Sequence, residues 1–208
     1  MSESLKAAVA FLCSFLKSAG PRVVPTLRTE RPTLLFTDGA CEEEGRLVTV
    51  GAILLSPRLD APEAFGFQVS QDLVDAWKSR GMDQKQVVGQ AELFPQLVAR
   101  TTWSHVLRHA QVLAFLDNNA ASSGLIRGYS PVVPSAEIIG AIWLEDSKLA
   151  CLSWYDRVPS PSNLADGPSR LDFSSLPEGT RVVEAVLPNA ACVFQASLRP
   201  RRGSGEGR

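Results

Sequence analysis

Two apolar segments that each end on an aspartate constrain the fold of this 208-residue chain more than any other feature. Residues 34–37 (LLFT) lead directly into Asp38, and residues 112–116 (VLAFL) lead into Asp117. Both runs are too short for a helix and have the composition of buried strands. If the two strands are parallel neighbours, their carboxylates emerge at one sheet edge, where open α/β sheets bind ligands. Because a lone strand-end aspartate more often begins a solvated turn, the pair carries more weight than either residue.

The order of the remaining segments predicts the fold class. Apolar runs at 33–37, 47–55 and 64–69 are joined by short turns and predict an antiparallel meander. Two later strands, at 112–116 and 149–155, alternate with helical patterns at 89–110, 120–126 and 135–144, and a last short helix begins near residue 162. We therefore expect an α/β domain with a mixed five-stranded sheet covered by helices.

Two further carboxylates lie near the starts of predicted helices, Glu92 before the second Asp-bearing strand and Asp166 in the last helix. Four carboxylates at one place repel each other unless cations compensate them, and oxygen ligands favour Mg²⁺ or Mn²⁺. Each residue also has a simpler interpretation. Glu92 could lie on a helix surface, Asp117 could cap the helix at 120–126, and Asp166 could be a helix-start carboxylate favoured by the dipole.

The motifs around these carboxylates resemble those of the ribonuclease H family. TDGA at 37–40, followed by GAIL at 51–54, is similar to the family's first hairpin. QAEL at 90–93 resembles the helix motif with the catalytic glutamate, and LDNNA at 116–120 resembles the next aspartate motif. NLADGPSR at 163–170 is similar to the ending found in ribonuclease H domains of retrotransposon reverse transcriptases. The resemblance covers about residues 33–172.

The resemblance implies a ribonuclease H-like fold and two-metal hydrolysis of RNA paired with DNA. It assigns catalysis and the binding of two Mg²⁺ or Mn²⁺ ions to four residues: Asp38, Glu92, Asp117 and Asp166. It also implies contacts with the nucleic acid from their neighbours: Gly39, Ala40, Asn118, Asn119, Asn163, Ser169 and Arg170. The implied partners are an RNA–DNA hybrid and, for a reverse transcriptase, its polymerase domain.

Two other functions stay open. One is a catalytically silent ribonuclease H-like domain with a structural or interaction role, which the complete set of four carboxylates opposes. The other is a different nuclease on the same fold, such as an exonuclease or an integrase-like enzyme, which the motif at 163–170 opposes. The net charge of −1 gives no overall positive field to attract nucleic acid, which mildly opposes stand-alone binding but allows a local basic patch. Binding of an RNA–DNA hybrid would therefore depend on local arginines (Arg22, Arg28, Arg31, Arg127) or on a polymerase domain.

Two extensions flank the predicted domain at 33–172. Residues 1–32 predict an amphipathic helix followed by a basic linker, because four apolar residues follow helical spacing: Leu5, Val9, Leu12 and Leu16. We favour this helix over a signal peptide, and it is too short to span a bilayer. Residues 173–208 form a C-terminal extension whose arginine-rich end is expected to be disordered. Four scattered cysteines fit reduced thiols, so we expect an intracellular protein, cytoplasmic or nuclear, without a membrane partner.

The helix at 89–110 raises two questions. Pro95 follows Glu92 by three residues, so the helix either starts near Phe94 or kinks. His105 and His109, the only histidines, lie late on this helix. On a continuous helix His105 would be roughly 20 Å from Glu92. Since a general base must reach its proton directly or through one water, we expect neither histidine to take part in chemistry.

Overall fold

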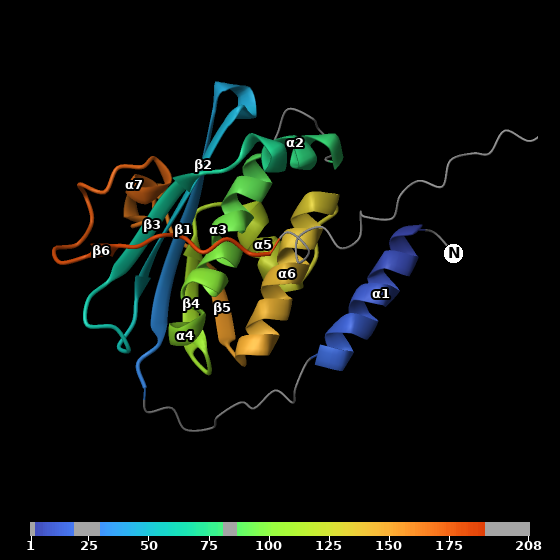
Figure 1. The fold of residues 1–208 in the computed structure, drawn as a ribbon, viewed down its shortest axis with the longest axis horizontal. Coiled ribbons are helices and arrows are strands. Elements are labelled where there is room, and N and C mark those ends of the chain that lie inside the picture. The colour runs from blue at the N-terminus through green and yellow to red at the C-terminus, as the bar shows by residue number, and fades with distance from the viewer. Residues whose placement is uncertain (1–2, 19–29, 81–86, 190–208) are drawn as a thin grey trace, which may run out of the picture.

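The computed structural model describes residues 3–18, 30–80 and 87–189, and its centre is one mixed six-stranded sheet (Figure 1). The strand order is β5-β4-β1-β2-β3-β6. The strands are β1 (Thr33–Glu42), β2 (Leu47–Leu55), β3 (Glu63–Gln68), β4 (Gln111–Leu116), β5 (Leu152–Arg157) and β6 (Arg181–Val182). The first three form the antiparallel meander, and β4 and β5 continue the sheet in parallel from β1. The predicted α/β class and ribonuclease H-like arrangement are confirmed.

Seven helices are present in the described residues, together with two 3₁₀ turns, η1 (Glu43–Gly45) and η2 (Ser160–Ser162). The helices are α1 (Glu3–Ser18), α2 (Gln71–Arg80), α3 (Val88–Thr102), α4 (Ser104–Leu107), α5 (Asn119–Arg127), α6 (Val133–Leu149) and α7 (Asp166–Ser169). Helix α3 packs on β1 and β2, and α6 packs on α3, while α7 lies at the opposite side of the sheet (Figure 1). None of the described helices is both long and apolar enough to cross a membrane.

Helix α3 is the central helix of the fold, since every residue from 90 to 100 is buried. The sheet and α6 cover two sides of it. The segment after β6 runs across it in Figure 1, where the backbone N–H of Val186 donates to Thr102 Oγ1 at 3.0 Å and Thr101 Oγ1 donates to the Val186 carbonyl. Val183 and Ala185 pack against the core. Residues beyond 172 therefore contribute to both the sheet and the covering of α3.

The predicted sheet has one strand fewer than the observed sheet. The sixth strand, β6, is only two residues long and pairs in parallel with the edge strand β3 through Glu63–Arg181 and Ala64–Val182. A two-residue strand has too short an alternating pattern to be seen in a sequence. The division of the chain into segments 1–32, 33–172 and 173–208 stays a prediction.

The helix predicted at 89–110 is interrupted, because α3 ends at Thr102 and the short α4 follows Trp103. Helix α3 starts at Val88 and continues through Pro95, so Glu92 lies inside it and not at a cap near Phe94. The cap of α5 is Asn118, whose Oδ1 accepts from the N–H groups of Ala120 and Ala121 at 2.9 and 3.0 Å. That excludes the capping role considered for Asp117.

Helix α1 lies beside α6 (Figure 1), and its Phe11 ring approaches Gly140, where an added Cβ would lie 3.1 Å from Phe11 Cε2. The predicted stripe of Leu5, Val9, Leu12 and Leu16 is exposed to solvent. Cys13, Cys41 and Cys151 are unpaired thiols. The basic linker with Arg22 and Arg28, the arginine-rich end and Cys192 lie outside the described residues.

Candidate metal centre

Asp38, Glu92 and Asp117 meet at the carboxyl end of β1 and β4. Each offers one carboxylate oxygen that lies within 4.8 Å of the other two. The parallel pairing of β1 with β4 causes the meeting of the two aspartates, since Phe36 is level with Phe115 and each strand delivers its aspartate two residues later. Asp38 and Glu92 are 4% and 5% exposed, and Asp117 is half-buried. We call these three residues the carboxylate trio.

Glu92 reaches the trio because α3 approaches β1 closely at Gly39. A Cβ built on Gly39 would lie 2.3 Å from the carbonyl oxygen of Ala91, the residue before Glu92. That oxygen would bond the amide of residue 95 in a regular helix, but Pro95 has no N–H to donate. Pro95 therefore does not displace Glu92. Pro95 leaves the Ala91 carbonyl without its helical partner, and this carbonyl faces Gly39 of β1. Any side chain at position 39 would overlap it.

Replacing Gly39 with alanine tests this close approach. The added methyl group would overlap the Ala91 backbone, so α3 must move away from β1 and carry Glu92 away from Asp38. We expect Gly39→Ala to weaken Mn²⁺ binding by about tenfold or more, as for other displaced metal ligands, and to lower the melting temperature. Isothermal titration calorimetry would measure the affinity. Gly89→Ala is the control, because a Cβ there meets only Ser135 Oγ at 3.7 Å; equal affinities of the two variants would contradict the argument.

Helix α7 fixes Asp38 from the other side of the sheet. Gly51 and Gly66 lie beneath α7, and a Cβ on either would lie 2.3 or 2.2 Å from its backbone at Ser169 N or Pro168 O. The two glycines thus let α7 lie directly on the strands. Ser169, which is fully buried, donates its hydroxyl to Asp38 Oδ2 at 2.5 Å.

Asp166, the fourth predicted ligand, lies outside the trio. Its side chain is 45% exposed, and its Oδ1 pairs with Arg170 Nη2 at 3.3 Å. Its charge nevertheless acts on the site, since it is among the charges that raise the pKa of Asp38. The structure therefore brings three of the four predicted carboxylates together and leaves the fourth at the rim.

The electrostatics of the trio are those of a site that lacks a positive charge. Burial, followed by the charges of Asp38 and Asp117, raises the pKa of Glu92 to about 9. Burial also raises the pKa of Asp38, against the opposing effect of the Ser169 hydrogen bond. Glu92 Oε2 and Asp117 Oδ1 are buried and have no hydrogen-bond partner among the described residues. An unsatisfied buried polar atom costs about 1–3 kcal/mol, so these oxygens fit ligands of a hard divalent cation.

Four residues predicted to contact nucleic acid also have structural roles. Gly39 and Ser169 have the packing roles described above. Asn163 is buried: its Nδ2 donates to the Thr37 carbonyl at 3.1 Å, and its Oδ1 accepts from Ala165 N at 3.2 Å. Asn118 caps α5. The nucleic-acid contacts of all seven residues stay predictions. Gly39, Ala40 and Asn118 are half-buried, and Asn119 and Arg170 are exposed.

One residue beside the site was missed. Arg157, the last residue of β5, is exposed, and its Nε donates to the Asp117 carbonyl at 3.1 Å. The sequence shows that Arg157 ends a predicted strand. It does not show that this strand pairs with β4 in the parallel register that places Arg157 beside Asp117.

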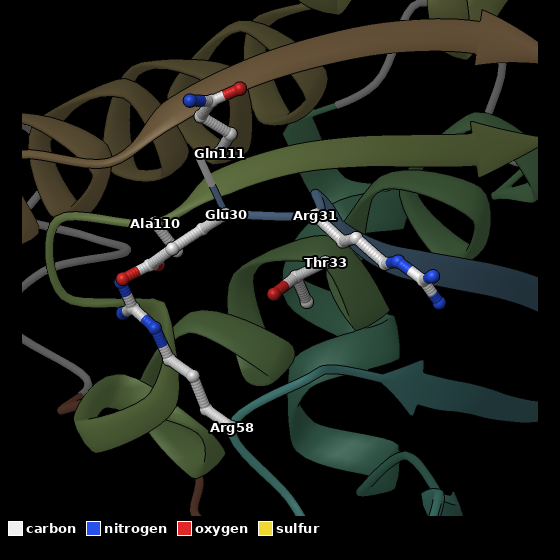
Figure 2. A pocket seen from close by; sticks show the side chains of 6 residues that line it. All are labelled: Glu30, Arg31, Thr33, Arg58, Ala110 and Gln111. Carbon is white, nitrogen blue, oxygen red and sulfur yellow. The ribbon is translucent and has the colours of Figure 1, made fainter. Parts of the chain in front are cut away.

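A small recess at the opposite end of the sheet is not a second site of this kind. Figure 2 shows its lining residues: Glu30, Arg31, Thr33, Arg58, Ala110 and Gln111. The Arg58 side chain has structural contacts in this recess. It donates to the carbonyls of Val106 and Arg108 at 2.9 and 2.7 Å and pairs with Glu30 at 2.9 Å. Its one carboxylate already has a cationic partner, unlike those of the trio.

Neither histidine lies on the helix that carries Glu92, because His105 is in α4 and His109 follows it. Both are exposed. We expect the double variant His105→Ala/His109→Asn to cleave substrate within about threefold of wild type, whereas loss of a general base removes roughly 10²–10⁴-fold. Asparagine is chosen at position 109 because the backbone there has a φ of 57°. Single-turnover rates across pH would check this; a hundredfold loss in folded protein would place the chemistry elsewhere.

No protein-family profile and no curated protein matches the chain. Among solved structures, it is similar to ribonuclease H1 from the halophilic archaeon Halobacterium salinarum (TM-score 0.44, 14% identity, covering 67% of this chain and 96% of that one). It is also similar to the N-terminal ribonuclease H domain of Rv2228c from Mycobacterium tuberculosis (TM-score 0.46, 11% identity, covering 69% of this chain and 94% of that one). A third similar structure is LC11 ribonuclease H1 in complex with an RNA/DNA hybrid (TM-score 0.45, 9% identity, covering 68% of this chain and 96% of that one). Identities from 9% to 14% do not assign the chain to a family.

Proposed function

We propose that this chain is a metal-dependent endonuclease that hydrolyses the RNA strand of RNA–DNA hybrids. The observation that carries the proposal is the carboxylate trio, in which two buried oxygens have no hydrogen-bond partner. The trio stands at the carboxyl end of the central parallel strands, and each member lies in a motif that resembles a catalytic motif of ribonuclease H.

In this proposal Asp38, Glu92 and Asp117 hold a divalent ion, Mg²⁺ or Mn²⁺, and Asp166 joins them in holding a second. When bound, such ions lower the pKa of the attacking water and neutralise charge on the departing oxygen. Ser169 orients the Asp38 carboxylate, leaving its Oδ1 free of that bond. Burial of Asp38 and Glu92 keeps their oxygens fixed and excludes bulk water from one side of the site.

Two exposed cations suggest how the substrate backbone is held. Arg157 and Arg170 flank the trio, next to Asp117 and Asp166 respectively. Arginine binds phosphate through two parallel hydrogen bonds. We propose that both contact phosphates of the hybrid, which supplies a local positive surface on a chain whose net charge is −1.

The choice of a hybrid as substrate, and of a retroelement reverse transcriptase as the source of the domain, follows from the resemblance of the motif at 163–170. A polymerase domain encoded next to this chain in its gene would support the proposal that the domain comes from a reverse transcriptase. Its absence would favour a separate ribonuclease H.

One assay tests the function. Purified protein is incubated with end-labelled RNA–DNA hybrid, duplex RNA and duplex DNA, in Mg²⁺, in Mn²⁺ and in EDTA. We expect internal cuts in the RNA strand of the hybrid only, and none in EDTA. Cleavage of duplex DNA, or trimming from an end, would indicate another nuclease. Binding of Mn²⁺ without cleavage of any substrate would indicate a catalytically silent domain.

A further inference from the structure

One turn of α3 separates Glu92 from a second buried polar residue, Gln96. Residues four apart on a helix share a face, so both side chains point toward β1. Gln96 is fully buried, and its Nε2 donates to Thr37 Oγ1 at 2.8 Å. Thr37 immediately precedes Asp38. This hydrogen bond therefore joins the helix that carries Glu92, four residues after it, to the strand that carries Asp38, one residue before it.

Arg100 fixes the orientation of the Gln96 amide. Its Nη1 donates to Gln96 Oε1 at 2.7 Å and to the Gln96 carbonyl at 2.8 Å. Because a guanidinium group can only donate, Oε1 must face Arg100, and the amide NH₂ must then face Thr37. Arg100 is itself 1% exposed and is held by Asp146 of α6 at 2.8 Å and by the Tyr155 hydroxyl of β5 at 2.9 Å.

The need for such a contact arises from Pro95. The proline removes a backbone hydrogen bond between the turn that carries Glu92 and the turn that carries Gln96. The Ala91 carbonyl faces Gly39, a contact that limits how near the helix comes but does not fix its position along the strand. The Gln96–Thr37 bond supplies that fixed position. The Thr37 carbonyl accepts a second hydrogen bond from Asn163 Nδ2 at 3.1 Å, so this residue of the strand is held by its backbone as well as by its side chain.

We propose that Gln96, oriented by Arg100, is a positioning residue that sets the separation of Glu92 from Asp38 for metal binding. The inference rests on the proposed function, because it assumes that the trio binds a divalent cation. It assigns to Gln96 no contact with the metal or the substrate.

Mn²⁺ affinity, measured by titration calorimetry on the full chain, tests the inference independently of cleavage. Gln96→Met keeps the size of the side chain and removes the amide, and Thr37→Val keeps the shape and removes the hydroxyl. We expect each to weaken Mn²⁺ binding by about tenfold, the effect of removing a group that orients a metal ligand. Thr37→Ser restores the hydroxyl and should bind within about threefold of wild type.

Tyr155→Phe is the matched control, because it removes a buried hydrogen bond to the same Arg100 without touching Gln96 or Thr37. It should lower the melting temperature while leaving Mn²⁺ affinity within about threefold of wild type. If Gln96→Met and Thr37→Val weaken Mn²⁺ binding no more than Tyr155→Phe does, Gln96 is only structural and the inference is overturned. If wild type itself binds Mn²⁺ no better than Asp38→Asn, the proposed function fails and this inference falls with it.

Discussion

Asp38→Asn and Asp117→Asn will each lower metal-dependent cleavage of the hybrid by about a hundredfold or more. Each substitution keeps the shape of the side chain but removes a negative charge that holds the ion. A bound metal contributes several kcal/mol to stabilising the transition state, and each 1.4 kcal/mol corresponds to about a tenfold change in rate. Single-turnover cleavage of labelled hybrid under saturating enzyme measures the loss.

The control for these variants is Asp60→Asn, which makes the same charge change at an exposed position between β2 and β3. Its rate should equal that of wild type. The metal-free Asp38→Asn protein should melt at a higher temperature than wild type, because one buried charge and its repulsion from Asp117 are removed. Near wild-type cleavage by either trio variant would disprove the assignment of the metal centre.

The second large effect is a dependence of metal-free stability on pH that Glu92 controls. Folding raises the pKa of Glu92 from 4.5 to about 9, so the folded protein binds its proton more tightly than the unfolded chain. The stabilisation is therefore fully present below pH 4.5 and is lost as pH rises through 9. Asp38, whose pKa is raised too, contributes in the same direction.

In EDTA, we expect the melting temperature of wild type to fall between about pH 5 and about pH 8.5, and by at least about 5 °C more than that of Glu92→Gln. Burial raises the pKa of the Cys41 and Cys151 thiols to about 11, above this window. Saturating Mg²⁺ should reverse the trend, because the ion binds the ionised carboxylates and competes with their protons. Parallel pH curves for wild type and Glu92→Gln, measured by calorimetry, would show that Glu92 does not hold the proton.

The features that could be predicted from the sequence are the local ones. The apolar runs before Asp38 and Asp117 each specify a strand with a carboxylate at its end. The sequence leaves their parallel pairing as a condition only, and the structure supplies it. The position of Glu92 could not be predicted, because a proline three residues later breaks helices unless another element accommodates the freed carbonyl. That element is Gly39, which is 52 residues away in sequence from Ala91, and nothing near Glu92 indicates it.

The structural roles of Asn163 and Ser169 could not be predicted for the same reason. Asn163 and Ser169 are polar residues in a motif at a catalytic edge, where either a substrate or the protein itself can satisfy them. Only the three-dimensional structure shows that Gly51 and Gly66 let α7 lie on the sheet and so bury both residues. Asp166, in contrast, is the first residue of α7, and its side chain stays 45% exposed beside Arg170.

The segment that crosses α3 after β6 has a consequence for folding during synthesis. Thr101 bonds to Val186, 85 residues further along the chain, and Ser169 bonds to Asp38 across 131 residues. The outer side of the central helix is therefore covered by some of the last described residues to leave the ribosome. Until they emerge, the meander and α3 can form only an open intermediate. In it, the side of α3 that these residues cover in the folded protein is exposed, and chaperones bind such surfaces. A chain truncated at residue 172 should resemble that nascent state, folding slowly and aggregating even though all four predicted carboxylates are present.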